Sequence, residues 1–140
     1  MDIITPEWPA PARVRAAQTT RHGGISTGKY CCLNLAQHVG DDETTVSKNR
    51  ALLRDRLSLP SEPLWLEQVH SSQVVVADEI KCGNDTLCAD GCVSTQRNVV
   101  AVVMTADCLP ILLCDTAGTC VAVVHAGWRG TLSGIAAMAI

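Results

Sequence analysis

Two apolar runs separated by only four residues constrain the fold of this 140-residue chain more than any other feature. The runs are residues 109–115 and 120–125, and residues 116–119 between them form a turn sequence that contains Gly118. Both runs are rich in Val, Ile and Leu, so they are predicted to be strands that pair as a hairpin. Because they are apolar on both faces, we expect them to be central in a sheet and covered on both sides.

The four-residue turn sets a register for this hairpin. In that register Pro110 faces His125, and Cys108 faces Gly127. Side chains alternate along a strand, so Cys108 and His125 become diagonal neighbours on one face, about 7 Å apart at their backbones. A slip of one residue would place them on opposite faces.

A second imidazole, His70, ends the segment of residues 65–70, and the hairpin register does not place it. Two histidines and one cysteine are three ligands of the kind that a catalytic zinc ion takes, with a fourth position left open. Two alternatives stay open at this point. Cys108 is a nucleophile with His125 as its general base, or the three side chains are ordinary packing and solvated groups.

Charged residues flank the predicted cluster. Asp107 precedes Cys108, and Arg129 lies beside two glycines where a helix is predicted to begin, at about Trp128. Helix N-terminal amides and a guanidinium together attract phosphate or carboxylate, although a plain surface arginine is an equal alternative. Arg21, next to Gly23, is a weaker case of the same kind.

Other segments give a coarse outline of the fold. A helix is predicted over about residues 43–57, capped by Asp41 or Asp42, with acidic residues at its start. The remaining predictions are a loop at residues 21–28, short strands at 73–77 and 98–104, an irregular stretch at 78–90, and a C-terminal helix containing Leu132, Ile135 and Met138 and weakened by Gly130 and Gly134. The chain stops inside that helix without a cap, so we expect it to be cut off before its natural end.

Composition excludes several classes of protein. The length is that of one domain, and the net charge is only −3. No basic stripe appears, so nucleic acid is a poor candidate partner. No apolar run is long enough for a membrane helix, and the N-terminus lacks the features of a signal peptide.

The chain has eight cysteines, which is many for its length. Without an export signal, free thiols in a reducing cytoplasm are favoured over disulfides. Cys31 and Cys32 are adjacent and do not resemble a disulfide staple. Cys82, Cys88 and Cys92 lie close in sequence, but their spacing matches no standard zinc finger, so buried or incidental thiols are favoured over a metal site.

Taken together, these segments resemble the YfiH family, also called the multicopper polyphenol oxidase (laccase-like) or purine nucleoside phosphorylase family. The resemblance spans nearly the whole chain and rests on an ordered set of motifs. In chain order these are residues 20–26 (TRHGGIS), 33–35 (LNL), 38–41 (HVGD), 49–50 (NR), 65–70 (WLEQVH), 89–91 (ADG), 104–110 (MTADCLP) and 125–130 (HAGWRG).

The resemblance implies an α+β fold with a mixed β-sandwich core flanked by helices, of which residues 1–140 are the N-terminal part of one longer domain. It implies a zinc site formed by His70, Cys108 and His125. It also implies phosphorolysis of adenosine, inosine and methylthioadenosine, with adenosine deamination as a side activity. The older polyphenol oxidase name implies copper, which the sequence supports less, since no multicopper ligand set is visible.

Roles for further residues follow from proximity to the motifs. Asp107 or Glu67 would move a proton or orient a zinc ligand. Phosphate or nucleoside binding is assigned to Arg21, Asn34, Gln68 and Arg129. Ser71 follows His70 where the family often has glycine, and the change is predicted to have little consequence. The alternatives are a cysteine hydrolase or deamidase that uses Cys108 and His125, and an inactive truncated module that only binds metal or a partner.

Overall fold

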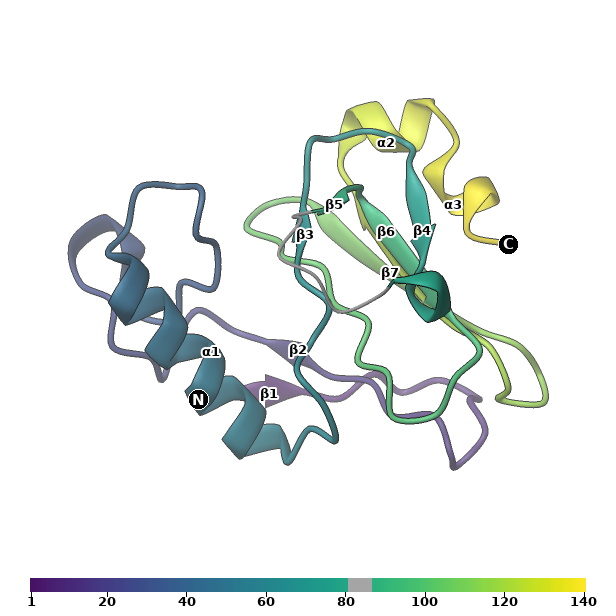
Figure 1. Ribbon diagram of the computed structural model, residues 1–140, viewed down its shortest axis with the longest axis horizontal. Coiled ribbons are helices and arrows are strands. Elements are labelled where there is room, and N and C mark those ends of the chain that lie inside the picture. The colour runs from purple at the N-terminus through teal and green to yellow at the C-terminus, as the bar shows by residue number, and fades with distance from the viewer. Residues whose placement is uncertain (81–86) are drawn as a thin grey trace. The chain divides into compact units, whose positions relative to one another are not determined.

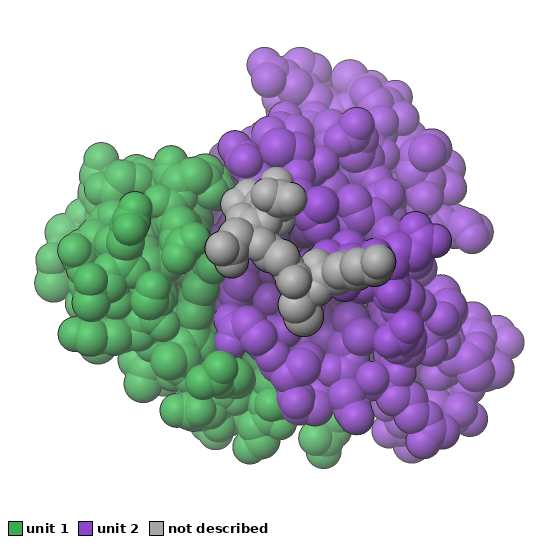
Figure 2. Space-filling view, viewed as in Figure 1, with its two compact units in different colours: residues 1–9, 15–59 green, residues 10–14, 60–140 purple. Residues whose placement is uncertain are grey.

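The computed structural model describes residues 1–80 and 87–140, and these residues form two compact units. Figure 2 colours the first unit, Met1–Pro9 with Arg15–Leu59, in green, and the second, Ala10–Val14 with Pro60–Ile140, in purple. Helices and sheets are mixed along the chain, as the α+β prediction requires. That residues 1–140 belong to one longer domain stays a prediction.

The first unit contains one long helix and a two-stranded antiparallel sheet (Figure 1). Its elements are β1 (Ile3–Ile4), β2 (Gln18–Thr19), the short 3-10 helix η1 (Gly28–Tyr30) and α1 (Glu43–Leu57). The bounds predicted for the helix are confirmed. The Asp42 side chain caps it by accepting a hydrogen bond from the backbone amide of Thr45 at 2.7 Å, and the helix ends at Ser58 in the left-handed conformation.

Asn49, on α1, holds the loops of this unit together. Its side chain is fully buried. The amide oxygen accepts from the backbone N–H of Ile25 at 2.9 Å, and the amide nitrogen donates to the Ser26 hydroxyl and the Asn34 carbonyl, each at 2.9 Å. The loop predicted at residues 21–28 is thus fixed by a buried amide.

The second unit is built on a four-stranded sheet of order β4-β6-β8-β7 (Figure 1). The strand β4 runs parallel to β6, and the other neighbours are antiparallel. The strands are β4 (Val74–Val76), β6 (Gly91–Ser94), β7 (Leu109–Cys114) and β8 (Val121–Ala126). The remaining elements are a parallel pair, β3 (Leu66–Glu67) with β5 (Leu87–Cys88), the 3-10 helix η2 (Ala77–Glu79), and the short helices α2 (Trp128–Leu132) and α3 (Ile135–Met138).

The hairpin register predicted from the turn is confirmed, since Pro110 pairs with His125 and Leu109 with Ala126. The expectation that both strands are central is right for β8 and wrong for β7. In the described part of the sheet, β7 has a neighbour on one side only. Its side chains are accordingly less covered, and Leu109 is 71 % exposed.

The strand predicted at residues 98–104 does not form. Only an isolated bridge joins Ala101 to Leu64, and Asn98 has a left-handed φ of 65°. At Met104 the backbone bonds to a side chain instead of a strand: the oxygen of Gln68 accepts from the amide of Met104 at 2.6 Å, and its nitrogen donates to the Met104 carbonyl at 2.8 Å. The apolar sequence of residues 98–104 is therefore not enough to form a strand, because a strand also needs a partner to pair with.

Two further predictions need correction. The stretch at residues 78–90, expected to be irregular, includes β5, and β6 just after it was not predicted. The C-terminal helix is interrupted at Gly134, whose φ is 78°, so it forms two short pieces, α2 and α3. Glycine was expected to weaken the helix and in fact breaks it.

One face of the sheet leads directly to the candidate site. Val123 lies in a buried core with Leu66, Ala89 and Cys92. Because side chains alternate along β8, His125 points to the same face as Val123. At this end of the sheet β4, β6 and β7 begin and β8 ends. Among residues 1–80 and 87–140, no helix has the length and apolar character that a membrane crossing requires.

Candidate metal centre

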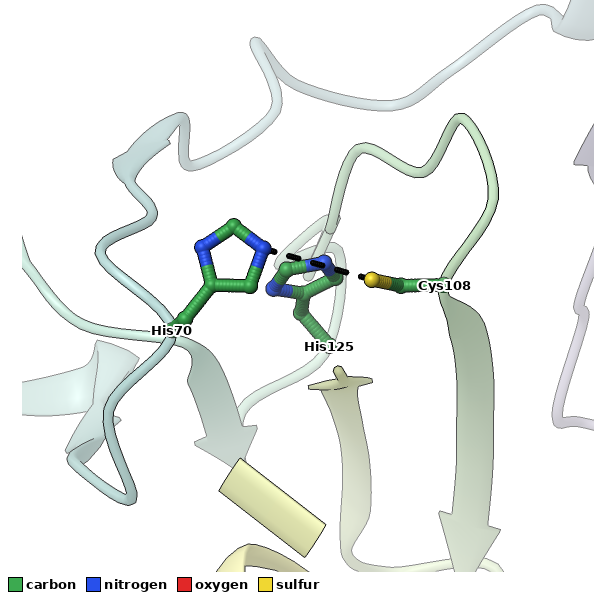
Figure 3. Close-up of side chains that lie close together, drawn as sticks. All are labelled: His70, Cys108 and His125. Carbon is green, nitrogen blue, oxygen red and sulfur yellow. Dashed lines mark hydrogen bonds between the residues drawn. The ribbon is translucent and has the colours of Figure 1, made fainter. Parts of the chain in front are cut away.

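Three segments meet at this end of the sheet and bring two imidazoles and a thiol together (Figure 3). His70 lies in the loop before β4, Cys108 immediately precedes β7, and His125 is in β8. Their donor atoms all lie within 4.8 Å of one another. Cys108 Sγ is 4.0 Å from His70 Nε2, and the two imidazole rings meet edge to face with their centroids 4.8 Å apart.

The cluster is buried on one side and accessible on the other. His125 is only 4 % exposed, Cys108 is half-buried and His70 is exposed. Solvent and small molecules therefore reach these groups from the His70 side.

Gly127 leaves the space between these groups free. A Cβ atom at this position would come 2.9 Å from Cδ2 of His70, 3.2 Å from Sγ of Cys108 and 3.7 Å from Cε1 of His125. The absence of a side chain at Gly127 therefore allows the three groups to approach one another.

The donor set fits a metal ion. Thiolate and imidazole are preferred ligands of zinc, and the ligands of a tetrahedral zinc ion lie about 3.4–3.7 Å from one another. Donor atoms within 4.8 Å of one another reach that spacing with small movements of the side chains. In the described part of the chain, His70, Cys108 and His125 are the only group of three or more such ligands that lie together.

The buried carboxylate of Asp90 contacts the imidazole ring of His125. Nδ1 of His125 lies 2.9 Å from Oδ1 of Asp90, which is fully buried. Burial disfavours the ionised form of Asp90, but hydrogen bonds from His125 and Ser71 outweigh burial and hold its pKa below the usual value. An ionised carboxylate only accepts hydrogen bonds, so Nδ1 of His125 is the donor in this contact, and Nε2 is the ring nitrogen left for a metal ion.

The environment of Cys108 does not favour a nucleophilic thiolate. Burial raises the pKa of its thiol, and the neighbouring Asp107 carboxylate raises it further. Reactive cysteines have the opposite environment, with a lowered pKa. A divalent cation reverses this balance, because a coordinating thiol is deprotonated by the metal.

Cys88 and Cys92, two of the three cysteines for which buried or incidental thiols are favoured over a metal site, lie in different environments. Cys92 is fully buried in β6, whereas Cys88 is exposed and donates to a carboxylate oxygen of Glu67 at 3.5 Å. Cys82 lies outside the described residues. All seven cysteines that the structure describes are free, as predicted.

The remaining predicted site residues differ in what their side chains contact. Arg21 and Asn34 belong to the first unit, where the Arg21 guanidinium donates to the Cys31 carbonyl and the Asn34 amide donates to Asp41 at 3.0 Å. The side chain of Gln68 makes two hydrogen bonds to the backbone of Met104, as described above. Asp107 and Arg129 are exposed, and the Arg129 guanidinium lies 5.2 Å from the centre of the Trp128 ring. The roles predicted for these residues stay predictions.

Two residues that are important to this geometry have no predicted role from the sequence. Asp90 lies inside the motif ADG, and Gly127 lies inside the motif HAGWRG. A signal was available for Gly127, because the hairpin register already placed it opposite Cys108. For Asp90 the sequence offered only an acidic residue between two small ones.

Comparison with known proteins shows the family to which the chain belongs. A family model described as "Multi-copper polyphenol oxidoreductase laccase" matches residues 15–140. A purine nucleoside phosphorylase of Pseudomonas aeruginosa is 50 % identical over 132 residues, covering 94 % of this chain and 52 % of that protein. The purine nucleoside phosphorylase YfiH of Escherichia coli is 45 % identical over 133 residues, covering 95 % of this chain and 54 % of that protein.

Solved structures give the same result. A DUF152 protein of Neisseria meningitidis superposes with a TM-score of 0.90 at 46 % identity, covering 99 % of this chain and 56 % of its own. YlmD from Geobacillus stearothermophilus superposes with a TM-score of 0.85 at 34 % identity, covering 94 % and 52 %. The chain belongs to the multi-copper polyphenol oxidoreductase laccase family, which is the YfiH family of the sequence resemblance. It spans about half the length of the curated relatives it matches.

Proposed function

We propose that this chain carries the metal centre of a zinc-dependent purine nucleoside phosphorylase. The observation that supports this most directly is the convergence of His70, Cys108 and His125, with donor atoms within 4.8 Å of one another. The relatives from Pseudomonas aeruginosa and Escherichia coli carry the name purine nucleoside phosphorylase. Since the chain spans about half of each relative, the whole activity is proposed for the protein to which these residues belong.

Zinc is the proposed ion. His70, Cys108 and His125 would hold it and leave a fourth position for solvent or substrate. When bound, zinc supplies a Lewis acid that polarises an oxygen ligand. Copper is the alternative suggested by the family description, but a single cluster of one thiol and two imidazoles is not a multicopper ligand set.

Phosphorolysis needs an anion held beside the ribose, and we propose Arg129 as the main anion-binding group. Its guanidinium is exposed, follows directly after Trp128 and lies within 5.2 Å of that ring. Guanidinium groups bind phosphate in a two-point geometry. Arg21, which belongs to the first unit, is also proposed to bind an anion. Asp107, exposed beside Cys108, is proposed to accept or return a proton.

Asn34 and Gln68, two residues with amide side chains, are predicted from the sequence to bind substrate. Their observed hydrogen bonds go to Asp41 and to Met104, respectively. We therefore propose that they serve substrate binding by fixing the loops that carry them.

Metal analysis combined with an inosine assay tests the proposal. We expect about one zinc per chain and phosphate-dependent release of hypoxanthine from inosine, with both lost in Cys108→Ala. An Arg129→Met variant should retain zinc and show a raised KM for phosphate. Phosphate-dependent release by the zinc-bound protein excludes an inactive module. If alkylation of cysteine abolishes activity in metal-free protein while a chelator has no effect, the cysteine hydrolase alternative replaces this proposal.

Adenosine deamination is proposed as a second activity of the same centre. Zinc held by cysteine and histidine is the arrangement that nucleobase deaminases use. Formation of inosine and ammonia from adenosine in the absence of phosphate tests this activity. The free thiols of the described chain also fit a reducing compartment, and we propose a cytoplasmic location.

A further inference from the structure

We infer that Asp90 is the positioning residue of this centre: its carboxylate fixes the loop that carries His70 and sets the tautomer of His125. The inference rests on the proposed function in one respect, namely that the two imidazoles bind a metal ion. It assigns no contact between Asp90 and the metal or the substrate.

The first line of support is the loop that carries His70. Oδ1 of Asp90 accepts a hydrogen bond from the backbone N–H of His70 at 3.0 Å. Oδ2 accepts from the backbone N–H groups of Val69 at 3.2 Å and Ser71 at 2.6 Å. Three successive amides that converge on one carboxylate form an anion-binding concavity.

This concavity requires an unusual backbone. His70 has a φ of 60°, in the left-handed region that only a few per cent of non-glycine residues adopt, although histidine is one of the residue types enriched there. The charge of Asp90 attracts the three N–H groups and so stabilises this conformation. The conformation in turn directs His70 toward Cys108, whose sulfur lies 4.0 Å from His70 Nε2.

The second line of support is His125. The same carboxylate lies 2.9 Å from His125 Nδ1, and the backbone carbonyl of Asp90 accepts from the backbone N–H of His125 at 2.7 Å. Two contacts from one residue thus fix both the strand position and the ring. Metal-binding histidines commonly have such a carboxylate on the second nitrogen, which fixes the ring and raises its basicity.

Asp90 is itself held rigidly. Its side chain is fully buried, and it lies between Ala89, which is also fully buried, and Gly91. A Cβ atom at Gly91 would come 2.7 Å from Cγ1 of Val124 and 3.0 Å from Cγ2 of Val74. The strand that begins here is therefore packed closely between its neighbours, and the carboxylate has little freedom to move.

Ser71 adds a contact that the sequence did not predict. Its hydroxyl donates to Oδ2 of Asp90 at 2.8 Å, in addition to the bond from its backbone. That serine in place of glycine has little consequence stays a prediction, and removing this bond tests it. Ser71→Gly therefore removes this bond to Asp90, and also the bond that the Ser71 hydroxyl accepts from the backbone N–H of Gln73 at 3.1 Å, while leaving the carboxylate in place.

Asp90→Asn is the principal test. An asparagine presents an N–H₂ donor to the N–H donors that now face two carboxylate oxygens, so it cannot satisfy them all. We expect zinc affinity, measured by competition with a chromophoric chelator, to fall about 10- to 100-fold. In the cobalt-substituted protein, we expect the visible ligand-field and thiolate charge-transfer bands to shift. Ser71→Gly should change both in the same direction by a smaller factor.

Asp78→Asn is the matched control. Asp78 is a half-buried carboxylate of the same unit that accepts hydrogen bonds from Ser94 and Thr95. Its substitution should leave zinc affinity and the cobalt spectrum at wild-type values. Wild-type affinity and an unchanged spectrum in Asp90→Asn would overturn the inference. If Asp90→Asn does not fold, an unchanged spectrum and affinity in Ser71→Gly would do so.

A measurement on metal-free protein separates this inference from the proposed function. The ¹⁵N chemical shifts of His125 report which ring nitrogen carries the proton. We expect the Nδ1–H form in the wild type and in Asp78→Asn, and a mixture of forms in Asp90→Asn. An Nε2–H form in the wild type would overturn the inference, whereas a wild type that shows Nδ1–H but binds no zinc would overturn only the proposed metal centre.

Discussion

Gly127 lies against the sulfur of Cys108: a Cβ atom at position 127 would be 3.2 Å from Sγ and 2.9 Å from Cδ2 of His70. The backbone at Gly127 has φ −66° and ψ 159°, which alanine adopts without strain. Gly127→Ala therefore tests the space between the metal-binding groups. Overpacking of this kind costs about 1–3 kcal/mol, so we expect zinc affinity to fall about ten-fold or more.

The stability of metal-free Gly127→Ala serves as the control. Without a bound ion, His70 and Cys108 are free to rotate away from the added methyl group, so the midpoint of urea unfolding should change little. Zinc affinity within two-fold of the wild-type value would show that the three groups do not converge on an ion at this position.

Zinc should stabilise the folded protein against unfolding. An ion that binds only the native state at about 1,000 times its dissociation constant adds about 4 kcal/mol to the free energy of unfolding. We expect this gain for the wild type, measured by thermal unfolding with and without zinc. Cys108→Ser and His125→Ala should lose most of it, because each removes one of three ligands.

Cys88→Ser is the matched cysteine variant for this experiment. Cys88 is exposed and its sulfur contacts Glu67 rather than the cluster. It should retain the full stabilisation by zinc. Loss of stabilisation in Cys88→Ser, with retention in Cys108→Ser, would place the ion at the other cysteines.

Local signals predicted much of the fold correctly. The helix at Glu43–Leu57 was predicted from a cap at Asp41 or Asp42 and from acidic residues at its start, and the β7–β8 register was predicted from a four-residue turn. Both depend on residues that are close in sequence. The strand expected at residues 98–104 does not form, because a strand needs a neighbouring strand to pair with. Only an isolated bridge from Leu64 to Ala101 forms here, and the backbone of Met104 bonds to the side chain of Gln68.

In the candidate site, too, the residues that are close in sequence were placed correctly and the distant one was not. Register placed Cys108 and His125 together, since one hairpin carries both. It gave no position for His70, which arrives from a loop whose left-handed residue is held by Asp90, 20 positions away in sequence. Contacts of this range depend on the assembled sheet. Ligand type and the family resemblance both grouped His70 with Cys108 and His125, but no local signal in the sequence gave the position of His70.

Asn49 should be essential to the stability of the first unit. Replacing it by leucine removes the acceptor for the Ile25 amide and the donor to Ser26 and leaves buried polar groups without partners. We expect a loss of about 2–4 kcal/mol in the free energy of unfolding, measured with urea. Lys48→Leu, at the exposed neighbouring position of α1, should change stability by less than about 0.5 kcal/mol. Equal effects of the two substitutions would contradict a structural role for the buried amide.

Asp78 should make stability depend on pH in the acid range. Hydrogen bonds from the Ser94 hydroxyl and from the side chain and backbone of Thr95 lower the pKa of its carboxyl from 3.8 to about 2. Because the folded-state pKa is the lower one, the ionised form stabilises the fold above about pH 4, and this contribution is lost as the pH falls toward 2. Asp78→Asn should therefore be less stable than the wild type at pH 7, and the difference should shrink as the pH approaches 2. Urea unfolding of both proteins between pH 2 and pH 7 measures it, and a difference that stays constant over this range would show that the hydrogen bonds do not favour the ionised carboxylate.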